Sequence, residues 1–506
     1  MGEHGEAIGI YGSSRLYGYL SSFADHLSRK TLCFLAWGKD AFDASLTGAF
    51  LRRCCESLKA ACAGSVFVKI GIWGLGLFVA PSGEPLRMET FLGAIAAAGC
   101  FMPTEILILA ALFFLFLTLW ERAAETHDRS SRPGQIRGYG GLLALPGFGL
   151  FLPLAVTFLF LAGAAVSSVV PRASAVSFLI WCFYILFFLM GFDAAFRGKA
   201  ESVIWPVLAG VTLSSLVGIY QHFSGWQPPR SWLDEKFEGE IVRVVGTFTN
   251  PTFFAEMIGL ALPVTLALLL KSRAWKDRIV LSGYAACQGF ALILTYSRGA
   301  WLGFMVSFAV MAVFYERKLL ILGVLAAVAA LFLAPPVLVE RLLSSFTLDD
   351  SSNSYRMFIW RGSIALLKAN FLRGVGLGAE SFVHVYPEYM IIQTPAPHAH
   401  STYLEMLIEL GLLGFAALMW FLVAWASYVF FTILKAEGRW GKRWAEIGIL
   451  SGIFSAIAGH MVQGVVEYTW YSPKIAMVYW LWVGLSAGIA ALRRRDEVGL
   501  SRDRAR

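Results

Sequence analysis

Long apolar segments recur along this chain and constrain its fold more than any other feature. Each can cross the hydrocarbon core of a bilayer, which takes about 20 residues of helix. Hydrophobic residues make up 57% of the 506 residues and charged residues only 15%, which is typical of membrane proteins. We therefore expect an all-α polytopic membrane protein with about twelve transmembrane helices. The expected spans are 65–80, 104–120, 141–164, 174–195, 202–222, 252–270, 279–296, 299–316, 319–338, 403–433, 445–465 and 474–492.

The connections between these spans divide into two sets by charge. Those on the side of the tail that begins at Arg493 carry about twice as many Lys and Arg residues as the others. Cytoplasmic connections carry such an excess, so we place this side, with both termini, in the cytoplasm. The formal charge of +8 follows from this bias, and no basic soluble face indicates a nucleic-acid partner.

Three regions follow from this topology. Residues 1–64 contain two amphipathic segments, interpreted as cytoplasmic helices on the membrane surface or, equally well, as a partly ordered extension. Residues 65–492 form the transmembrane bundle, with outer loops 223–251 and 339–402, the second of which joins spans 9 and 10 and should contain helices. Residues 493–506 form a basic cytoplasmic tail. None of the seven Cys residues lies in an outer loop, so no disulfide is expected.

Three inward-running helices are expected to begin at the outer face, each beside a cation or an imidazole. In the first, Asn250 suits the cap and Pro251 the first helical position, and Arg243 precedes them. In the second, Ser297 can cap the helix and Arg298 lies in its first turn. A helix N-terminus with an arginine beside it is a common binding site for phosphate or pyrophosphate.

The third helix start lies near His400. Thr402 and Glu405 match the T-x-x-E capping box, and His400 stands two residues before that cap. Because all three starts lie on one side, they predict an outward-facing site for a polyanion. Each residue alone has a plainer interpretation: Arg298 as a cation reaching the lipid headgroups, and Arg243 and His400 as solvated loop residues.

The long outer loop offers further candidates. Apolar spacing over 355–369 predicts a helix that could act as a lid. Arg356 and Arg361 could contact the substrate or form a solvated helix face, and Trp360 could stack on sugar or pack on the bundle. No metal-ligand spacing of Cys and His is present, so neither a metal nor a cofactor is expected.

Polar residues within the expected spans have structural interpretations. For Glu256 we prefer an ion pair with an arginine over a role as a second acid or base. His460, Gln463 and Glu467 share the outward-leading end of one helix. They could line an acceptor cleft, although hydrogen bonding between helices is the better interpretation for a lone histidine there.

The segment around His400 resembles the O-antigen ligase and polymerase superfamily of bacterial membrane glycosyltransferases. The outer-loop signature of that family, H-[N/S/Q]-x9-G-x-x-G, is matched by His400 and Ser401, then nine residues, then Gly411 and Gly414. The resemblance covers residues 200–425. The other matching segments are 243–251 and 296–301, similar to the two arginine elements of the family, and 374–382, similar to its glycine-rich piece.

The resemblance implies a glycosyltransferase of the bacterial inner membrane, in the biosynthesis of lipopolysaccharide or another cell-envelope polysaccharide. It would move a glycan from undecaprenyl diphosphate to an acceptor hydroxyl on the periplasmic side. By position, Arg243 and Arg298 would hold the diphosphate, and His400 would lie at the reacting centre as a base or a diphosphate ligand. The expected substrate contacts are Asn250, Ser297, Ser401, Arg356, Trp360 and Arg361.

Ligase and polymerase differ only in their acceptor, which would be lipid A core, a growing polymer or a protein, and the sequence does not decide among them. The alternative from another class is a transporter or flippase of the same lipid-linked glycan, without transferase activity. A transporter should have charged residues along a path across the membrane and often internal repeats. Here the candidate cations gather at one end and no repeat is evident, so we prefer the transferase. A non-catalytic glycan-binding protein is the third possibility.

Overall fold

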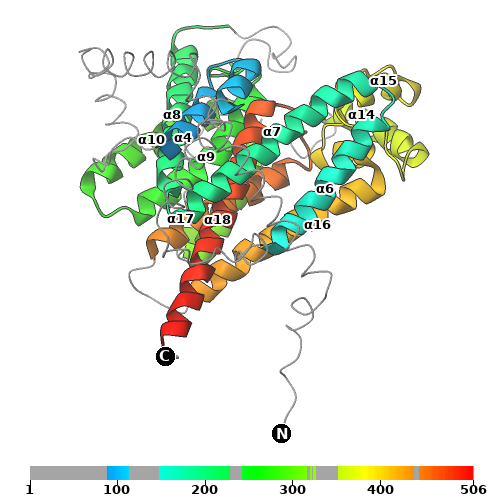
Figure 1. Ribbon diagram of the computed structural model, residues 1–506. Helices are drawn as coiled ribbons and strands as arrows, with labels where there is room; N and C mark the ends of the chain where they lie inside the picture. Colours follow the sequence, from blue (N-terminus) through cyan, green and yellow to red (C-terminus); the bar gives the residue numbers. More distant parts are fainter. Residues whose placement is uncertain are drawn as a thin grey trace, which may run out of the picture. The chain divides into compact units, whose positions relative to one another are not determined.

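The computed structural model is all-helical in the residues that it describes (Figure 1). The chain divides into two compact units, residues 1–75 with 109–148 and residues 76–108 with 149–506. Nearly all described residues belong to the second unit. The described residues are 88–112, 148–227, 242–315, 319–321, 323–325, 351–437 and 444–504.

The helices follow the apolar segments of the sequence. Within the described residues, six helices are long and apolar enough to cross a membrane: α6, α7, α8, α9, α16 and α18. The full series is α4 (Met88–Ala98), α6 (Phe148–Val166), α7 (Pro171–Phe196), α8 (Ala200–Phe223), α9 (Pro251–Lys271), α10 (Trp275–Leu294), α11 (Arg298–Tyr315), α14 (Ser351–Ala369), α15 (Ala379–Val385), η5 (Tyr386–Glu388), α16 (Thr402–Glu437), α17 (Trp444–Gln463) and α18 (Pro473–Arg504).

These helices confirm the all-α polytopic fold. The six candidate spans coincide with six of the expected ones, and α10, α11 and α17 coincide with three more, although α11 and α17 count as shorter apolar helices. The total of twelve stays a prediction, because the expected span 65–80, the second part of 104–120 and most of 319–338 lie outside the described residues. So do the amphipathic segments in 1–64. The long loop does contain helices, namely α14, α15 and η5.

The helices pack closely through small residues. Gly484 and Gly488 of α18 form a G-x-x-x-G pair against α7, where a Cβ on Gly484 would lie 2.0 Å from the Phe188 carbonyl oxygen. Between α11 and α17, a Cβ on Gly459 would lie 2.1 Å from the Gly303 carbonyl oxygen. Small residues allow this approach in membranes, where van der Waals packing drives helix association. The second contact joins two of the helices that build the candidate site.

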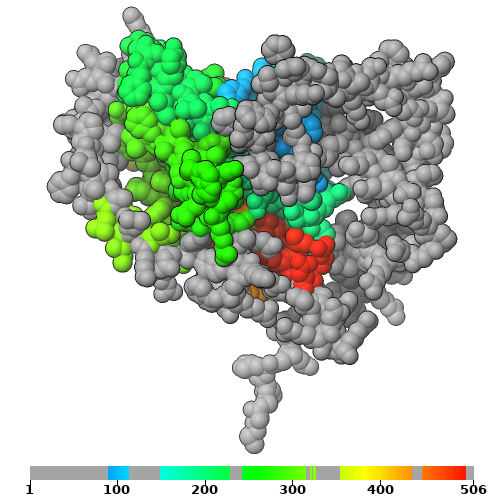
Figure 2. Space-filling model, turned by 90° about the vertical axis from the view of Figure 1, so that its left-hand side faces the viewer, coloured from blue at the N-terminus to red at the C-terminus, as the bar shows by residue number. Residues whose placement is uncertain are grey.

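Large apolar side chains of α8, α10 and α11 are exposed, and this part of the chain, drawn in shades of green, forms part of the face that Figure 2 shows. The exposed side chains include Tyr220 and Phe223 of α8, Ile279 and Ile293 of α10, and Leu302 of α11. A large exposed apolar face is rare on a soluble protein but is what lipid contact requires. This face therefore agrees with a membrane location.

The helix α16 is broken, whereas the sequence predicts one continuous span over 403–433. Gly411 adopts φ 66° and ψ 179°, outside the helical region, so nearby backbone groups lose their partners within the helix. A neighbouring segment pairs with them: Val375 N donates to Ile408 O at 2.9 Å, and Leu412 N donates to Phe371 O at 2.8 Å. The break thus separates a short first half of α16 from a long second half.

Glycines make this crossing possible and explain the spacing of the signature. A Cβ on Gly374 would lie 2.6 Å from Gly411 N, and a Cβ on Gly411 would lie 2.4 Å from Leu372 O. The second glycine of the signature, Gly414, packs towards α6, where a Cβ would lie 3.5 Å from the Phe160 Cβ. The nine residues between Ser401 and Gly411 therefore form the short half-helix that ends at the crossing.

Candidate functional site

The three predicted helix starts meet around the connection between α17 and α18, residues 464–472. At the start of α16, the Thr402 hydroxyl donates to Glu467 O at 3.0 Å. At the start of α9, the Phe253 ring lies 6.0 Å from the Tyr471 ring. At the start of α11, a Cβ on Gly299 would lie 3.8 Å from the Glu467 Cγ. The convergence expected from the sequence is therefore present in the structure.

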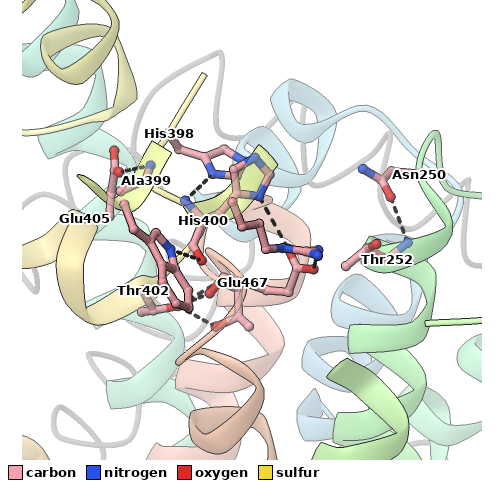
Figure 3. Close-up of polar contacts among 11 residues, drawn as sticks. Asn250, Thr252, His398, Ala399, His400, Thr402, Glu405 and Glu467 are labelled. Atoms are coloured by element: carbon pink, nitrogen blue, oxygen red, sulfur yellow. Dashed lines mark hydrogen bonds and ion pairs between the residues drawn. The ribbon is translucent and has the colours of Figure 1, made fainter. Parts of the chain in front are cut away.

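The start of α9 has the predicted cap. The Asn250 Oδ1 accepts a hydrogen bond from Thr252 N at 2.7 Å, and Pro251 takes the first helical position. In Figure 3 this cap lies to the right of the histidine turn. Capping uses one side-chain oxygen, while the amides at the start of a helix retain a partial positive charge. The N-terminal end of α9 is thus suited to bind an anion.

The structure brings Arg243 to the turn that carries Arg298. The Arg243 Nε donates to Thr295 O at 3.0 Å, and Thr295 is the C-cap of α10, three residues before Arg298 begins α11. Ser297, the expected cap, is buried in this turn, and its carbonyl accepts from Trp301 N at 3.0 Å. Both arginines make further interactions within the protein. The two guanidinium-bearing elements thus form one local structure.

The prediction that Thr402 and Glu405 form a capping box at the start of α16 is wrong. The helix begins at Thr402, so Ser401 precedes it, and the Ser401 hydroxyl accepts a long hydrogen bond of 3.5 Å from Leu404 N. Glu405 is therefore one position too deep to serve the box, and its Oε2 instead accepts from Ala399 N at 2.6 Å. The carboxylate holds the loop before the helix and not the helix end.

His400 lies in a strained turn held from several sides. Its φ of 48° is unusual for a residue with a side chain. His400 N donates to the His398 Nδ1 at 3.1 Å, and the Trp360 Nε1 donates to His400 O at 3.4 Å (Figure 3). Such strain persists only where the surrounding structure enforces it, and it clusters at functional sites. The turn thus fixes the position of the imidazole.

Glu467 faces this imidazole. The Glu467 Oε2 lies 3.7 Å from the His400 Nδ1, and the other carboxylate oxygen forms an ion pair with Arg356 of α14. Burial alone would raise the pKa of Glu467, but Arg356 and His400 lower it to about 2. The carboxylate is therefore charged at physiological pH. It is 13% exposed and His400 is 20% exposed, so the pair remains within reach of a ligand.

His398 is an uncharged imidazole. Burial disfavours its charged form, and with His400 nearby the pKa of His398 falls to about 3. Its Nδ1 accepts a hydrogen bond, so its proton resides on Nε2. Its ring packs 4.3 Å from the His400 ring and 4.7 Å from the Tyr471 ring. His398 thus supports the turn as an uncharged acceptor.

The remaining predicted contacts fall into two groups. Arg356 and Trp360 of α14 reach the site directly, through Glu467 and His400 respectively. Arg361 is exposed on the same helix, and within the described part of the chain the structure does not bring it to the residues above. Ser401 is buried beside His400.

Two polar residues differ from their expected roles. Among the described residues, Glu256 forms no ion pair, and its Oε2 is buried without a hydrogen-bond partner. The described residues also supply no hydrogen-bond partner to either ring nitrogen of His460, although hydrogen bonding between helices was expected. The His460 ring instead packs against the Tyr479 ring, with centroids 5.4 Å apart.

Glu467 has a more central position than its sequence context indicates. The sequence indicates one polar group at a helix end, whereas the structure places Glu467 where the three helix starts meet. One signal was available: a single carboxylate among aromatic residues in a short outer connection, Glu467 to Tyr471. Within the described residues, no three His, Cys, Asp or Glu side chains are grouped to hold a metal ion.

One comparison with known proteins relates part of this chain to a family. No curated protein matches the chain significantly. A family model described as O-antigen ligase matches residues 283–419, which include the turn at Arg298, the helix α14, the His400 turn and the break in α16. Several apolar helices, together with this match, indicate a multi-pass membrane protein. The matched region supports the O-antigen ligase and polymerase superfamily, to which the signature around His400 points.

Proposed function

We propose that this protein transfers a glycan from undecaprenyl diphosphate to an acceptor hydroxyl at the periplasmic face of the bacterial inner membrane. The observation that carries this proposal is the meeting of two arginine elements with the His400 and Glu467 pair at one end of the helices. The acceptor is lipid A core, a growing polysaccharide or a protein. The family match supports glycan transfer in a membrane.

The diphosphate binds, in this proposal, between the starts of α9 and α11. Arg243 and Arg298 supply two guanidinium groups there, and the free amides of the two helix starts add positive potential. When the glycosidic bond to the diphosphate breaks, negative charge grows on the leaving group. Donors already in place stabilise this charge without reorganising, which is commonly the largest contribution to catalysis. Transfer then needs no divalent metal.

His400 takes the proton of the acceptor hydroxyl. The hydroxyl oxygen bonds to the anomeric carbon, the carbon–oxygen bond to the diphosphate breaks, and its electron pair leaves with the diphosphate. Because the His400 Nδ1 faces Glu467 at 3.7 Å, the Nε2 is the atom that accepts the proton. The Glu467 carboxylate stabilises the resulting imidazolium, as acids behind catalytic histidines do. This geometry favours a base over a diphosphate ligand.

The surrounding side chains take supporting roles. Arg356 holds Glu467 in place through its ion pair, and Trp360 offers an indole beside the His400 turn for a sugar ring. Asn250, Ser297 and Ser401 lie at the three helix starts, close to the proposed diphosphate and acceptor positions. Arg361, on the exposed part of α14, contacts the glycan farther from the bond that breaks.

A flippase for the same lipid-linked glycan predicts another arrangement. It would need charged residues along a path across the membrane and a binding site near the midplane. In the described residues, the proposed cations and the His400 pair lie at the helix ends around residues 464–472. This clustering supports a reaction at one surface.

Purified protein tests the proposal. With an undecaprenyl-diphosphate-linked oligosaccharide and an acceptor, wild-type protein should attach glycan in the presence of EDTA, measured by mass spectrometry of the acceptor. His400→Ala should reduce kcat by about 10²-fold or more, as expected when a general base is lost. Gln288→Ala is the matched control, since Gln288 bonds Thr265 and Thr212 inside the bundle. Wild-type rates in folded His400→Ala protein would contradict the proposed site.

A further inference from the structure

We propose that Glu405 is a positioning residue, which holds the peptide between His398 and His400 so that the His400 imidazole faces Glu467. This inference rests on the proposed function for its effect on rate. Its effect on the turn can be measured without any transfer.

The peptide between the histidines has one side-chain partner from α16. Ala399 is fully buried, and its N–H donates to the Glu405 Oε2 at 2.6 Å. The next residue, His400, has a φ of 48°, which a residue with a Cβ adopts at a cost. Further hydrogen bonds to the backbone of His400 come from His398, within the turn, and from Trp360 of α14. Glu405 therefore links the strained turn to the helix that follows.

Simple helix capping does not explain this carboxylate. Ser401 already contacts the first turn of α16, and Glu405 has no exposed surface. Its Oε1 is also buried, and the Glu405 and Glu409 carboxyl groups share a hydrogen bond. A buried carboxyl group disfavours folding unless hydrogen bonds compensate, so an apolar residue would suit a merely structural position better. Of its contacts, the hydrogen bond from the Ala399 amide is the one that joins Glu405 to the histidine turn.

A second buried carboxyl group extends the same arrangement. Glu409 lies one helical turn after Glu405, and its two oxygens accept from Gly378 N at 2.6 Å and from the Tyr468 hydroxyl at 3.2 Å. Glu409 thus holds the glycine-rich segment and the connection that carries Glu467. Together the two carboxyl groups tie the short half of α16 to both partners of the catalytic pair, and Glu405 is the one that touches the histidine turn.

Three variants of the full-length protein test the role of Glu405. Glu405→Gln keeps an oxygen that can accept from Ala399 N, Glu405→Ala removes it, and Gln288→Ala again removes a buried polar group elsewhere. We expect Glu405→Ala to lower kcat by about 10- to 100-fold with KM changed less than about threefold, since a displacement of about 1 Å can cost that much. Glu405→Gln should restore kcat to within about threefold of wild type, and Gln288→Ala should match wild type in kcat.

A second measurement follows the turn without any transfer. Diethyl pyrocarbonate modifies accessible imidazoles, and peptide mass spectrometry can report the rate at His398 and His400. Glu405→Ala should raise this rate at least about threefold by releasing the turn, and Glu405→Gln should not.

The two measurements separate the two proposals. If wild-type protein transfers no glycan but the modification rates follow this pattern, the proposed function fails and the positioning role stands. If His400→Ala abolishes transfer while Glu405→Ala keeps wild-type kcat and modification rates, the positioning role fails. Equal losses in Glu405→Gln and Glu405→Ala would also overturn it, because a charge would then be what matters.

Discussion

The start of α9 and the start of α16 both face residues 464–472 but are built differently. Asn250 and Pro251 give α9 a standard cap with ordinary backbone angles. Before α16, His400 has a φ of 48°, and the helix breaks at Gly411. One start needs only local side-chain chemistry, whereas the other depends on contacts from distant segments.

This difference matches what each side has to do. A diphosphate carries spread charge, so helix amides and arginines can bind it without tight geometry. A base must lie within hydrogen-bonding distance of one proton, which requires a rigid turn. Changes that loosen the α16 side should therefore reduce kcat strongly, and changes at the α9 side should have smaller effects.

Among changes that test this comparison, Gly411→Ala should have the largest effect. The backbone angles at Gly411 belong to a region that only glycine adopts readily, and a Cβ there would lie 2.4 Å from Leu372 O. We expect a loss of about 1–3 kcal/mol in unfolding free energy and about 100-fold in kcat, measured by thermal unfolding in detergent and by glycan transfer. Gly289→Ala is the control, since a Cβ there meets no atom within 4 Å. Equal kcat in the two variants would contradict the rigid-turn interpretation.

Arg243→Lys should have the next largest effect. A lysine keeps the charge but loses the planar guanidinium, which reaches Thr295 O through its Nε and presents other donors to a diphosphate. We expect kcat/KM to fall about 10-fold. Arg197→Lys serves as control, because Arg197 pairs with Asp193 at the far end of α7. An unchanged kcat/KM in Arg243→Lys would mean that the Arg243 guanidinium does not bind the donor diphosphate.

Glu467→Gln should change the pH dependence of stability. Because Arg356 and His400 lower the folded-state pKa of Glu467 from 4.5 to about 2, the carboxylate stabilises the fold fully above pH 4.5. That contribution declines as pH falls towards 2 and is on the order of 3 kcal/mol. Thermal unfolding at pH 6 and pH 3 should show the wild type losing more stability than Glu467→Gln. Identical losses in both proteins would mean that Glu467 is not held as a charged group.

The α9 side of the site could be predicted from the sequence better than the α16 side. The sequence predicts the α9 cap, the Arg298 turn and most described helices, because a cap or an apolar period is a local signal. The break at Gly411 could not be read, since a glycine in an apolar run does not show that residues 371–376 will pair with the freed backbone. Nor could the contacts of Glu467, whose partners His400 and Arg356 are far away in the sequence.

The smallest effect is expected from Asn250→Ala. Losing the hydrogen bond to Thr252 N should lower the unfolding free energy by about 1 kcal/mol. The kcat should stay within about threefold of wild type, because Pro251 still begins α9 and Arg243 is held by the neighbouring turn. Thermal unfolding and transfer rates on the same sample measure both. A loss of kcat as large as that of Gly411→Ala, with only a small loss of stability, would mean that the Asn250 side chain itself contacts the donor. The α9 start would then need the same tight geometry as the α16 start.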